Sequence, residues 1–294
     1  MAVSRLVSFS LTTGNLERLA AFYRDAFGCQ TLAREIMSGP DFESLMGVRA
    51  GAQRMMLGLG HERIELLQFE RTGQPYPQDS ASSDLFFQHF AIVVAHMDQA
   101  FEQLSRAQGW TSISMSGPQR LPAQSGGVTA FKFRDPDGHP LELLAFPSGQ
   151  APPAWQPGPD GALCSGIDHS AISVADSARS IAFYAALGLC VCARSLNRGA
   201  EQARLDDVPQ PQVEVTALAL SQGGPHLELL CYRGVKRGEP IRLRNNDTAT
   251  TRLILETTQP GSSASGARFE RCLLDPDGHH LLLVPPAQAS TQNG

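Results

Sequence analysis

The chain has 294 residues, of which 42% are hydrophobic and 18% are charged. These values are typical of folded globular proteins and exclude disordered, collagenous and coiled-coil chains. The length predicts two domains. With 24 basic and 29 acidic residues the net charge is −5, and no basic block stands out, so we expect no nucleic-acid partner. There is no membrane-length apolar run and no signal-peptide pattern at the start, so we expect a cytoplasmic protein without a membrane partner.

The sequence repeats itself, which is the strongest indication of its architecture. The segment SFSLTTGNLERLAAFYRDAFG from Ser8 aligns with HSAISVADSARSIAFYAALG from His169. Each segment predicts a strand, a capped amphipathic helix and a glycine that ends the helix. A third copy, HFAIVVAHMDQAFEQLSRAQG, begins at His89, and a shortened fourth copy contains TTRLILE. The residues expected to cap the three helices are Asn15, Asp98 and Asp176.

Each copy also ends in a similar strand: RIELLQF, PLELLAF, HLELLCY and HLLLV. Two of these strands follow the same turn, DPDGH, at residues 135–139 and 275–279. Proline, aspartate and glycine in this order favour a tight turn, so we predict a hairpin between the last two strands of a unit. The predicted fold class is therefore α+β, with four βαβββ modules of which the fourth is abbreviated.

The module boundaries predict the domain organisation. Residues 1–149 contain two modules, and residues 164–286 contain two more, the last of them degenerate. Residues 150–163 are rich in proline and glycine, which predicts a linker. We expect residues 287–294 to form a disordered tail.

Three glutamates interrupt the apolar pattern of the last strands. Glu65, Glu142 and Glu228 each stand between leucines, and alternation points each carboxylate to the opposite face of its strand. On a dry concave surface such a group needs a metal ion or a cationic partner. On an open sheet it needs only water, and for each glutamate taken singly this second interpretation is favoured.

Two histidines change that balance. His89 and His169 open the first strands of the second and third modules, at the same point relative to the helix cap. Each of these modules therefore combines one imidazole with one carboxylate, and two modules facing each other would supply two of each. Such a set suits a divalent ion such as Zn, Ni, Mn, Co or Fe(II). His139 and His279 follow the turn glycines in both hairpins, so we expect them to have turn or packing roles.

The repeat, the Phe-Tyr helix ends, the DPDGHPLELL hairpin and the His/Glu pairs together resemble the vicinal oxygen chelate superfamily. That superfamily includes glyoxalase I, extradiol dioxygenases, and fosfomycin and bleomycin resistance proteins. The resemblance implies two domains of cupped mixed sheets with helices outside, and a metal held by first-strand and last-strand side chains of paired modules. The implied positions are Ser8 and Glu65, His89 and Glu142, and His169 and Glu228. In the fourth module Thr251 or Arg252 replaces the histidine, and Leu282 replaces the glutamate.

Two ways of pairing the modules follow from this resemblance. Consecutive pairing would offer Glu65, His89 and Glu142 in the first half of the chain. Pairing of the inner modules would assemble His89, Glu142, His169 and Glu228, and would leave the first and fourth modules as a metal-free pair. We favour the inner pairing, because it places every lost ligand in one inactive site. Glu65 would then need another partner, such as an inward-pointing Arg252, or solvent.

The resemblance implies a metalloenzyme acting on a small substrate that is chelated through vicinal oxygens, most like a lactoylglutathione-lyase-type isomerisation. Glu142 or Glu228 would then act as the base. An Fe(II) extradiol dioxygenase is an alternative, and His226 is its only candidate for a further acid-base histidine. A metal-free protein that sequesters a drug or another small molecule is the third hypothesis. The expected partner is a small-molecule substrate, and the expected state is a monomer or a homodimer.

Overall fold

The computed structural model describes residues 2–155, 161–235, 237–238, 240–258 and 271–286. The helices are α1 (Leu16–Phe27), α2 (Pro40–Met46), α3 (Met97–Arg106), α4 (Ser177–Ala186) and α5 (Ala200–Asp206), with short 3₁₀ turns η1 (Ala123–Ser125) and η2 (Pro153–Trp155). Within these ranges no helix has the length and apolar character needed to cross a membrane. The tail predicted at 287–294 lies outside the described residues.

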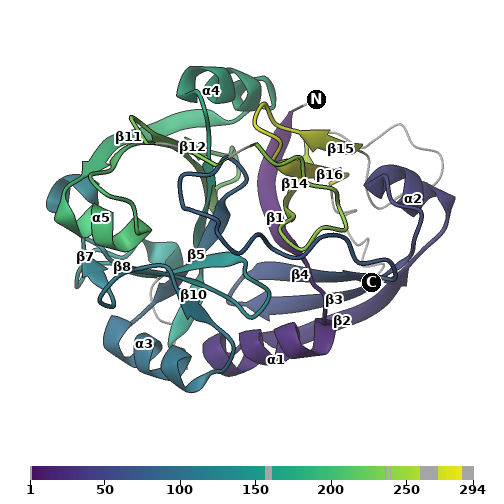
Figure 1. The fold of residues 1–294 in the computed structure, drawn as a ribbon, viewed down its shortest axis with the longest axis horizontal. Coiled ribbons are helices and arrows are strands. Elements are labelled where there is room, and N and C mark those ends of the chain that lie inside the picture. The colour runs from purple at the N-terminus through teal and green to yellow at the C-terminus, as the bar shows by residue number, and fades with distance from the viewer. Residues whose placement is uncertain (1, 156–160, 236, 239, 259–270, 287–294) are drawn as a thin grey trace, which may run out of the picture.

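The strands form two mixed sheets, shown side by side in Figure 1. The sheet that we call the outer sheet contains β1 (Val3–Thr12), β2 (Gln30–Met37), β3 (Ala52–Leu59), β4 (Glu62–Phe69), β14 (Thr251–Thr257), β15 (Arg271–Leu274) and β16 (His280–Val284). The inner sheet contains β5 (Gln88–Val94), β6 (Thr111–Ser112), β7 (Gln119–Arg120), β8 (Thr129–Arg134), β9 (Pro140–Ala145), β10 (Cys164–Ser173), β11 (Cys190–Arg198), β12 (Gln212–Ala219) and β13 (His226–Tyr232). The predicted α+β class is confirmed.

The pairing of first strands shows how the modules combine. β5 of the second module runs antiparallel to β10 of the third, and β1 of the first runs antiparallel to β14 of the fourth. The favoured inner pairing is therefore confirmed. Each sheet takes strands from both halves of the chain, so the boundaries 1–149 and 164–286 follow the sequence repeats and not the two sheets.

The predicted helix caps are correct in two of three cases. The Asn15 side chain accepts a hydrogen bond from the Arg18 amide, and Asp176 accepts from the amide of Ala178. The expectation for Asp98 was wrong, because α3 begins two residues earlier: His96 occupies the cap position without a side-chain cap hydrogen bond, and Asp98 lies in the first turn. A carboxylate in the first turn still interacts favourably with the helix dipole.

Both DPDGH turns form the predicted hairpins, and each also fastens a helix. In the first turn Asp135 accepts hydrogen bonds from the backbone amide of His139 (3.0 Å) and from the hydroxyl of Tyr23 on α1 (3.2 Å). Tyr184 on α4 donates to Asp275 of the second turn in the same way (3.1 Å). The repeated tyrosine therefore attaches the helix of one module to the turn of the next, and the buried His139 completes this structural cluster, as expected.

Helices cover different faces of the sheets. Helices α1, α3 and α4 pack on the large core that both sheets share, and Figure 1 shows α1 and α3 as neighbours along one side of the molecule. Helix α2 lies over the concave face of the outer sheet, where Phe42 and Met46 pack against Ile254 and Leu282. Over the inner sheet, Leu205 of α5 packs against Ala91 and Leu144. The two concave faces are thus covered by different side chains, which decides what each can bind.

Candidate metal centre

The four ligands predicted from the inner modules lie on the concave face of the inner sheet: His89 on β5, Glu142 on β9, His169 on β10 and Glu228 on β13. Strand register explains why they converge. Ala171 is paired with His89 on one neighbouring strand and with Glu228 on the other. Ala91 is paired in the same way with His169 and Glu142. Two small residues therefore occupy the centre of the set and leave space between the four longer side chains.

The side chains form two histidine–glutamate pairs around this space. His89 Nε2 lies 3.2 Å from Glu142 Oε2, and His169 Nε2 lies 3.7 Å from Glu228 Oε2. The two imidazole rings are 5.8 Å apart between centroids. One ligand atom from each of His89, Glu142 and His169 lies within 4.8 Å of the others. Glu228 lies outside that tightest group.

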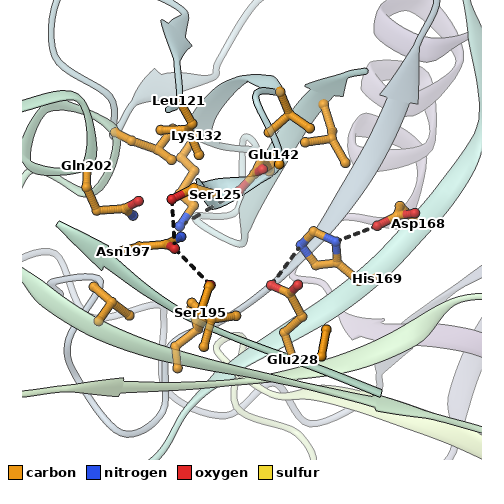
Figure 2. Close-up of a pocket in the computed structure, with 18 of the residues that line it drawn as sticks. Leu121, Ser125, Lys132, Glu142, Asp168, His169, Ser195, Asn197, Gln202 and Glu228 are labelled. Atoms are coloured by element: carbon orange, nitrogen blue, oxygen red, sulfur yellow. Dashed lines mark hydrogen bonds and ion pairs between the residues drawn. The ribbon is translucent and has the colours of Figure 1, made fainter. Parts of the chain in front are cut away.

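All four residues line a cavity of about 350 Å³. Figure 2 shows Glu142 beside Lys132 on one side, with His169 and Glu228 further along the pocket. His89 is 2% exposed and Glu142 is 5% exposed. The alternative in which Glu142 simply faces solvent is therefore wrong.

Burial and neighbouring charges set the proton affinities of the four groups. Burial lowers the pKa of His89, and the charge of Lys132 contributes, so that the pKa is about 4. Burial also disfavours charge on His169, but the carboxylates of Glu228 and Asp168 outweigh it and raise the pKa to about 9. Burial opposes ionisation of Glu228, yet His169 and His226 hold the pKa of its carboxyl at about 2. One histidine is thus neutral and the other protonated at neutral pH.

Asp168, which orients His169, is a site residue that the sequence pattern does not indicate. Asp168 Oδ2 lies 2.9 Å from His169 Nδ1, and Trp155 of η2 donates a hydrogen bond from its indole to the other oxygen of Asp168 (2.9 Å). Adjacent residues on a regular strand point to opposite faces, so alternation argued against this contact. The pairing of β10 with β5 shifts register between Ile167 and His169, and this irregularity at Asp168 breaks the alternation.

We predict that Asp168→Ala lowers the affinity for a divalent metal about tenfold. A carboxylate that holds the second nitrogen of a ligating histidine fixes its orientation, and such partners are worth roughly 10- to 100-fold in affinity. We expect the lower end of that range, because losing Asp168 also weakens proton binding to His169. Competition with a chelator at pH 8 measures the change. Asp176→Ala, which removes a distant helix cap, is the control, and equal affinities for the two variants would contradict an orienting role.

Lys132 is a second site residue that was missed. It lies on β8 directly opposite Glu142 across the hairpin, and its ammonium is 2.7 Å from Asp206 and 3.8 Å from Glu142. Burial disfavours the charge, but Asp206 and Glu142 raise the pKa of Lys132 above its ordinary value. The sequence does contain an indication of its role. Lys132 stands between Phe131 and Phe133 and interrupts the apolar pattern of its strand, as the glutamates do in theirs.

His226 lies beside the centre without lining its cavity. Its Nε2 is 3.4 Å from Glu228 Oε1, and its ring centroid is 5.3 Å from that of His169. Asp168, His169 and His226 form a second group whose possible ligand atoms lie within 4.8 Å of one another. His226 and Glu228 are two residues apart on β13, so their side chains share one face of the strand.

The outer sheet carries the equivalent positions with different residues. Ser10 is paired with Glu65 and with Arg252, as Ala171 is paired with Glu228 and His89, so Arg252 stands in the place of a histidine. The prediction that Glu65 pairs directly with Arg252 or with solvent is wrong. Its ion-pair partner is Arg54 of β3 at 3.2 Å, and Glu65 is only 1% exposed. The Arg54 guanidinium reaches this carboxylate from the paired strand. Alignment of the repeats compares equivalent positions and does not indicate contacts between neighbouring strands.

This arrangement also decides against the alternative ligand set. Glu65 belongs to the outer sheet, whereas His89 and Glu142 belong to the inner sheet. Arg252 is fully buried, and burial lowers its pKa to about 10 despite the opposing effect of Glu65. Leu282 and the α2 side chains fill the remaining concave surface. A cation-rich, apolar environment of this kind does not suit a metal ion.

The inner set, by contrast, fits a divalent ion by its chemistry. Two imidazoles and two carboxylates are the mixed nitrogen and oxygen donors that Zn, Ni, Mn, Co and Fe(II) accept. Asp168 occupies Nδ1 of His169 and leaves Nε2 toward the cavity. His89 likewise presents Nε2 to Glu142.

Comparisons with known proteins agree with this architecture. Residues 5–143 match the sequence profile of the Glyoxalase/Bleomycin resistance protein/Dioxygenase superfamily. Glyoxalase I from Zea mays has a TM-score of 0.60 at 21% identity, with 96% of this chain and 92% of that chain covered. A putative dioxygenase from Bacillus subtilis subsp. subtilis str. 168 has a TM-score of 0.56 at 11% identity, with 97% and 86% covered. No curated protein matches in sequence. The predicted resemblance is confirmed: residues 5–143 match the sequence model of the Glyoxalase/Bleomycin resistance protein/Dioxygenase superfamily, and the fold of the whole chain is similar to that of glyoxalase I.

Proposed function

We propose that the chain is a divalent-metal enzyme that isomerises a small substrate bound through two adjacent oxygens, in the manner of a lactoylglutathione lyase. The observation that carries this proposal is the convergence of His89, Glu142, His169 and Glu228 from two modules on one cavity. Four such side chains would hold the ion and leave positions for substrate oxygens. When bound, the ion supplies Lewis-acid stabilisation of negative charge on those oxygens.

The residues of the chain supply the remaining chemistry. Glu142 or Glu228 would accept the proton from the carbon that bears the chelating hydroxyl and deliver it to the adjacent carbonyl carbon. The hydroxyl proton would move to the second oxygen, so that the hydroxyl and the carbonyl exchange places. The apolar side chains of Leu121, Leu144 and Val215 line the same cavity, and they keep water from competing for the proton. Through its contact with Nδ1, Asp168 would keep Nε2 of His169 available to the ion.

One observation favours a second candidate, an Fe(II) extradiol dioxygenase. The tightest group, His89, Glu142 and His169, is a set of two histidines and one carboxylate, as non-haem Fe(II) oxygenases use. His226 lies close enough to serve as the additional acid-base histidine. A metal-free binding protein is the third candidate. The cavity is compatible with it, but this function would not explain why two histidines and two glutamates converge there.

Metal analysis and two assays separate these functions. The purified protein is analysed for metals and then reloaded with Zn, Ni or Fe(II) after chelation. We expect about one Zn or Ni per chain and isomerisation of a hydroxycarbonyl substrate, for which the hemithioacetal of methylglyoxal and glutathione is the first assay compound. Fe(II) with oxygen uptake on catechols would support the dioxygenase instead. If no metal binds and chelation leaves the melting temperature unchanged, the metalloenzyme proposal is wrong.

Metal affinity is expected to rise with pH, because metal and proton compete for His169. Its pKa is about 9, whereas that of His89 is about 4 and that of Glu228 is about 2. Between pH 6 and 8, binding must therefore displace one proton, and the apparent association constant should rise about tenfold per pH unit. Calorimetry in two buffers of different ionisation enthalpy counts the released protons. A constant affinity without proton release would contradict this assignment.

A further inference from the structure

We propose that Lys132 binds a carboxylate on the substrate, next to the two chelating oxygens, so that the pocket accepts small oxygen-rich acids. This inference rests on the proposed function, which sets where the chelating oxygens lie, and it adds the chemical class of the substrate. Lys132 lines the same cavity as the four metal-ligand candidates. Its side chain is only 5% exposed, so a ligand would meet it away from bulk water.

A rigid network holds the ammonium in place. Lys132 Nζ donates to Asp206 Oδ1 at 2.7 Å. The other oxygen of Asp206 accepts hydrogen bonds from Gln202 Nε2 (2.7 Å) and from the Tyr232 hydroxyl (3.0 Å). Asp206 is therefore bonded through both oxygens and is 1% exposed. Residues this constrained can position a charge for recognition without losing much side-chain entropy on binding.

The ion pair presents its positive end to the cavity. Lys132 lines the cavity, whereas Asp206 lies behind it and is not part of the lining. An ammonium has three N–H donors, and Asp206 takes one of them. Glu142 is 3.8 Å away, which is beyond hydrogen-bond distance. Among the described residues no other acceptor is within reach, so two donors remain for a ligand.

Charge explains why the ligand group should be anionic. Lys132 and a divalent ion held by Glu142 would be two positive charges with this one carboxylate as a shared neighbour, and like charges repel each other. A carboxylate placed between them is attracted by both and accepts charge-assisted hydrogen bonds from the ammonium. Lys132 and the ion would share Glu142 as a neighbour. A substrate carboxylate that contacts Lys132 would therefore stand next to the oxygens that chelate the ion. In Figure 2 Lys132 and Glu142 lie together on one side of the pocket.

The test compares two hydroxamates, which chelate a metal through two adjacent oxygens and differ in one group. Malonic acid monohydroxamate carries a carboxylate, and isovalerohydroxamate carries two methyl groups of similar size. Calorimetry on the zinc-loaded protein should show at least about tenfold tighter binding of the acid, which is the usual effect of a hydrogen bond to a charged group. Equal or weaker binding of the acid would overturn the inference.

Three variants assign the effect to Lys132. The double variant Lys132→Met with Asp206→Asn removes both charges together, so that no buried charge is left alone, and should abolish the preference. Lys132→Arg keeps the charge and should retain it. Arg194 is an exposed cation that also lines the cavity, and Arg194→Met should retain the preference. If Arg194→Met abolishes it and the double variant does not, the assignment to Lys132 is wrong.

A preceding zinc titration separates this inference from the proposed function. If zinc binds but the hydroxamates bind equally, only the role of Lys132 fails. If zinc does not bind, the metal function fails, and ligand-observed NMR on the metal-free protein compares malonate with isovalerate. A preference for malonate that the double variant loses would still support the carboxylate site. No preference would overturn it as well.

Discussion

His169→Ala and Glu142→Gln are expected to lower the affinity for zinc by more than about a hundredfold each. Both side chains face the same cavity, and each offers a ligand atom in the tightest group of potential metal ligands. Partners outside a ligand set are already worth roughly 10- to 100-fold, so loss of a direct ligand should cost more. Competition with a chelator measures the affinity, and thermal unfolding without metal shows whether the fold is intact.

Glu65→Gln is the matched control for these variants. Glu65 occupies the position on the outer sheet that Glu228 occupies on the inner sheet, but its neighbour is Arg54 and not a histidine. The substitution should leave zinc affinity and turnover nearly unchanged. The reverse result, in which Glu65→Gln abolishes metal binding and His169→Ala has no effect, would place the working site in the outer sheet and contradict the assignment.

The repeats made the fold predictable, because each module contains the same strand, helix and hairpin signals. The convergence of His89, Glu142, His169 and Glu228 on one cavity was predictable for the same reason: a residue that breaks the apolar alternation at the same place in several modules marks one face of the sheet. Inner pairing could be favoured from the sequence because it places Ser8, Arg252 and Leu282, which replace potential metal ligands, in the same pair of modules. The strand register places the equivalent residues as that argument required.

Contacts between modules could not be predicted by the same route. Asp168 reaches His169 only because a register shift interrupts β10, and single-sequence patterns do not reveal such shifts. The Lys132–Asp206 ion pair joins β8 to the end of α5, 74 residues away, so no local pattern contains it. Arg54 meets Glu65 from the neighbouring strand, a relation that depends on the pairing of β3 with β4. Periodicity indicates which face a residue occupies, but the partners on that face depend on register.

Arg252→Met is expected to lower the free energy of unfolding by about 3–5 kcal/mol, the usual cost of breaking a buried charged network. The Arg252 side chain is fully buried. It donates hydrogen bonds to Asn245 Oδ1 (2.8 Å) and Ser10 Oγ (3.1 Å), and further bonds to Thr12 Oγ1 and to the carbonyl of Asn245. Methionine can fill much of the volume, but it leaves these buried acceptors without a donor, and Glu65 loses a nearby positive charge.

Arg5→Met is the control, because Arg5 also joins β1 to β14. It contacts Glu256 through two hydrogen bonds of 3.0 and 2.9 Å, but its side chain is 43% exposed, and an exposed pair contributes about 1 kcal/mol or less. Urea unfolding followed by circular dichroism measures both variants, and zinc affinity is measured on the folded protein. If the outer pair is structural, Arg252→Met should lose stability while zinc affinity stays unchanged. A loss no larger than that of Arg5→Met would mean that the Arg252 network contributes little to stability. A loss of zinc affinity in the folded variant would mean that the outer sheet controls the inner site.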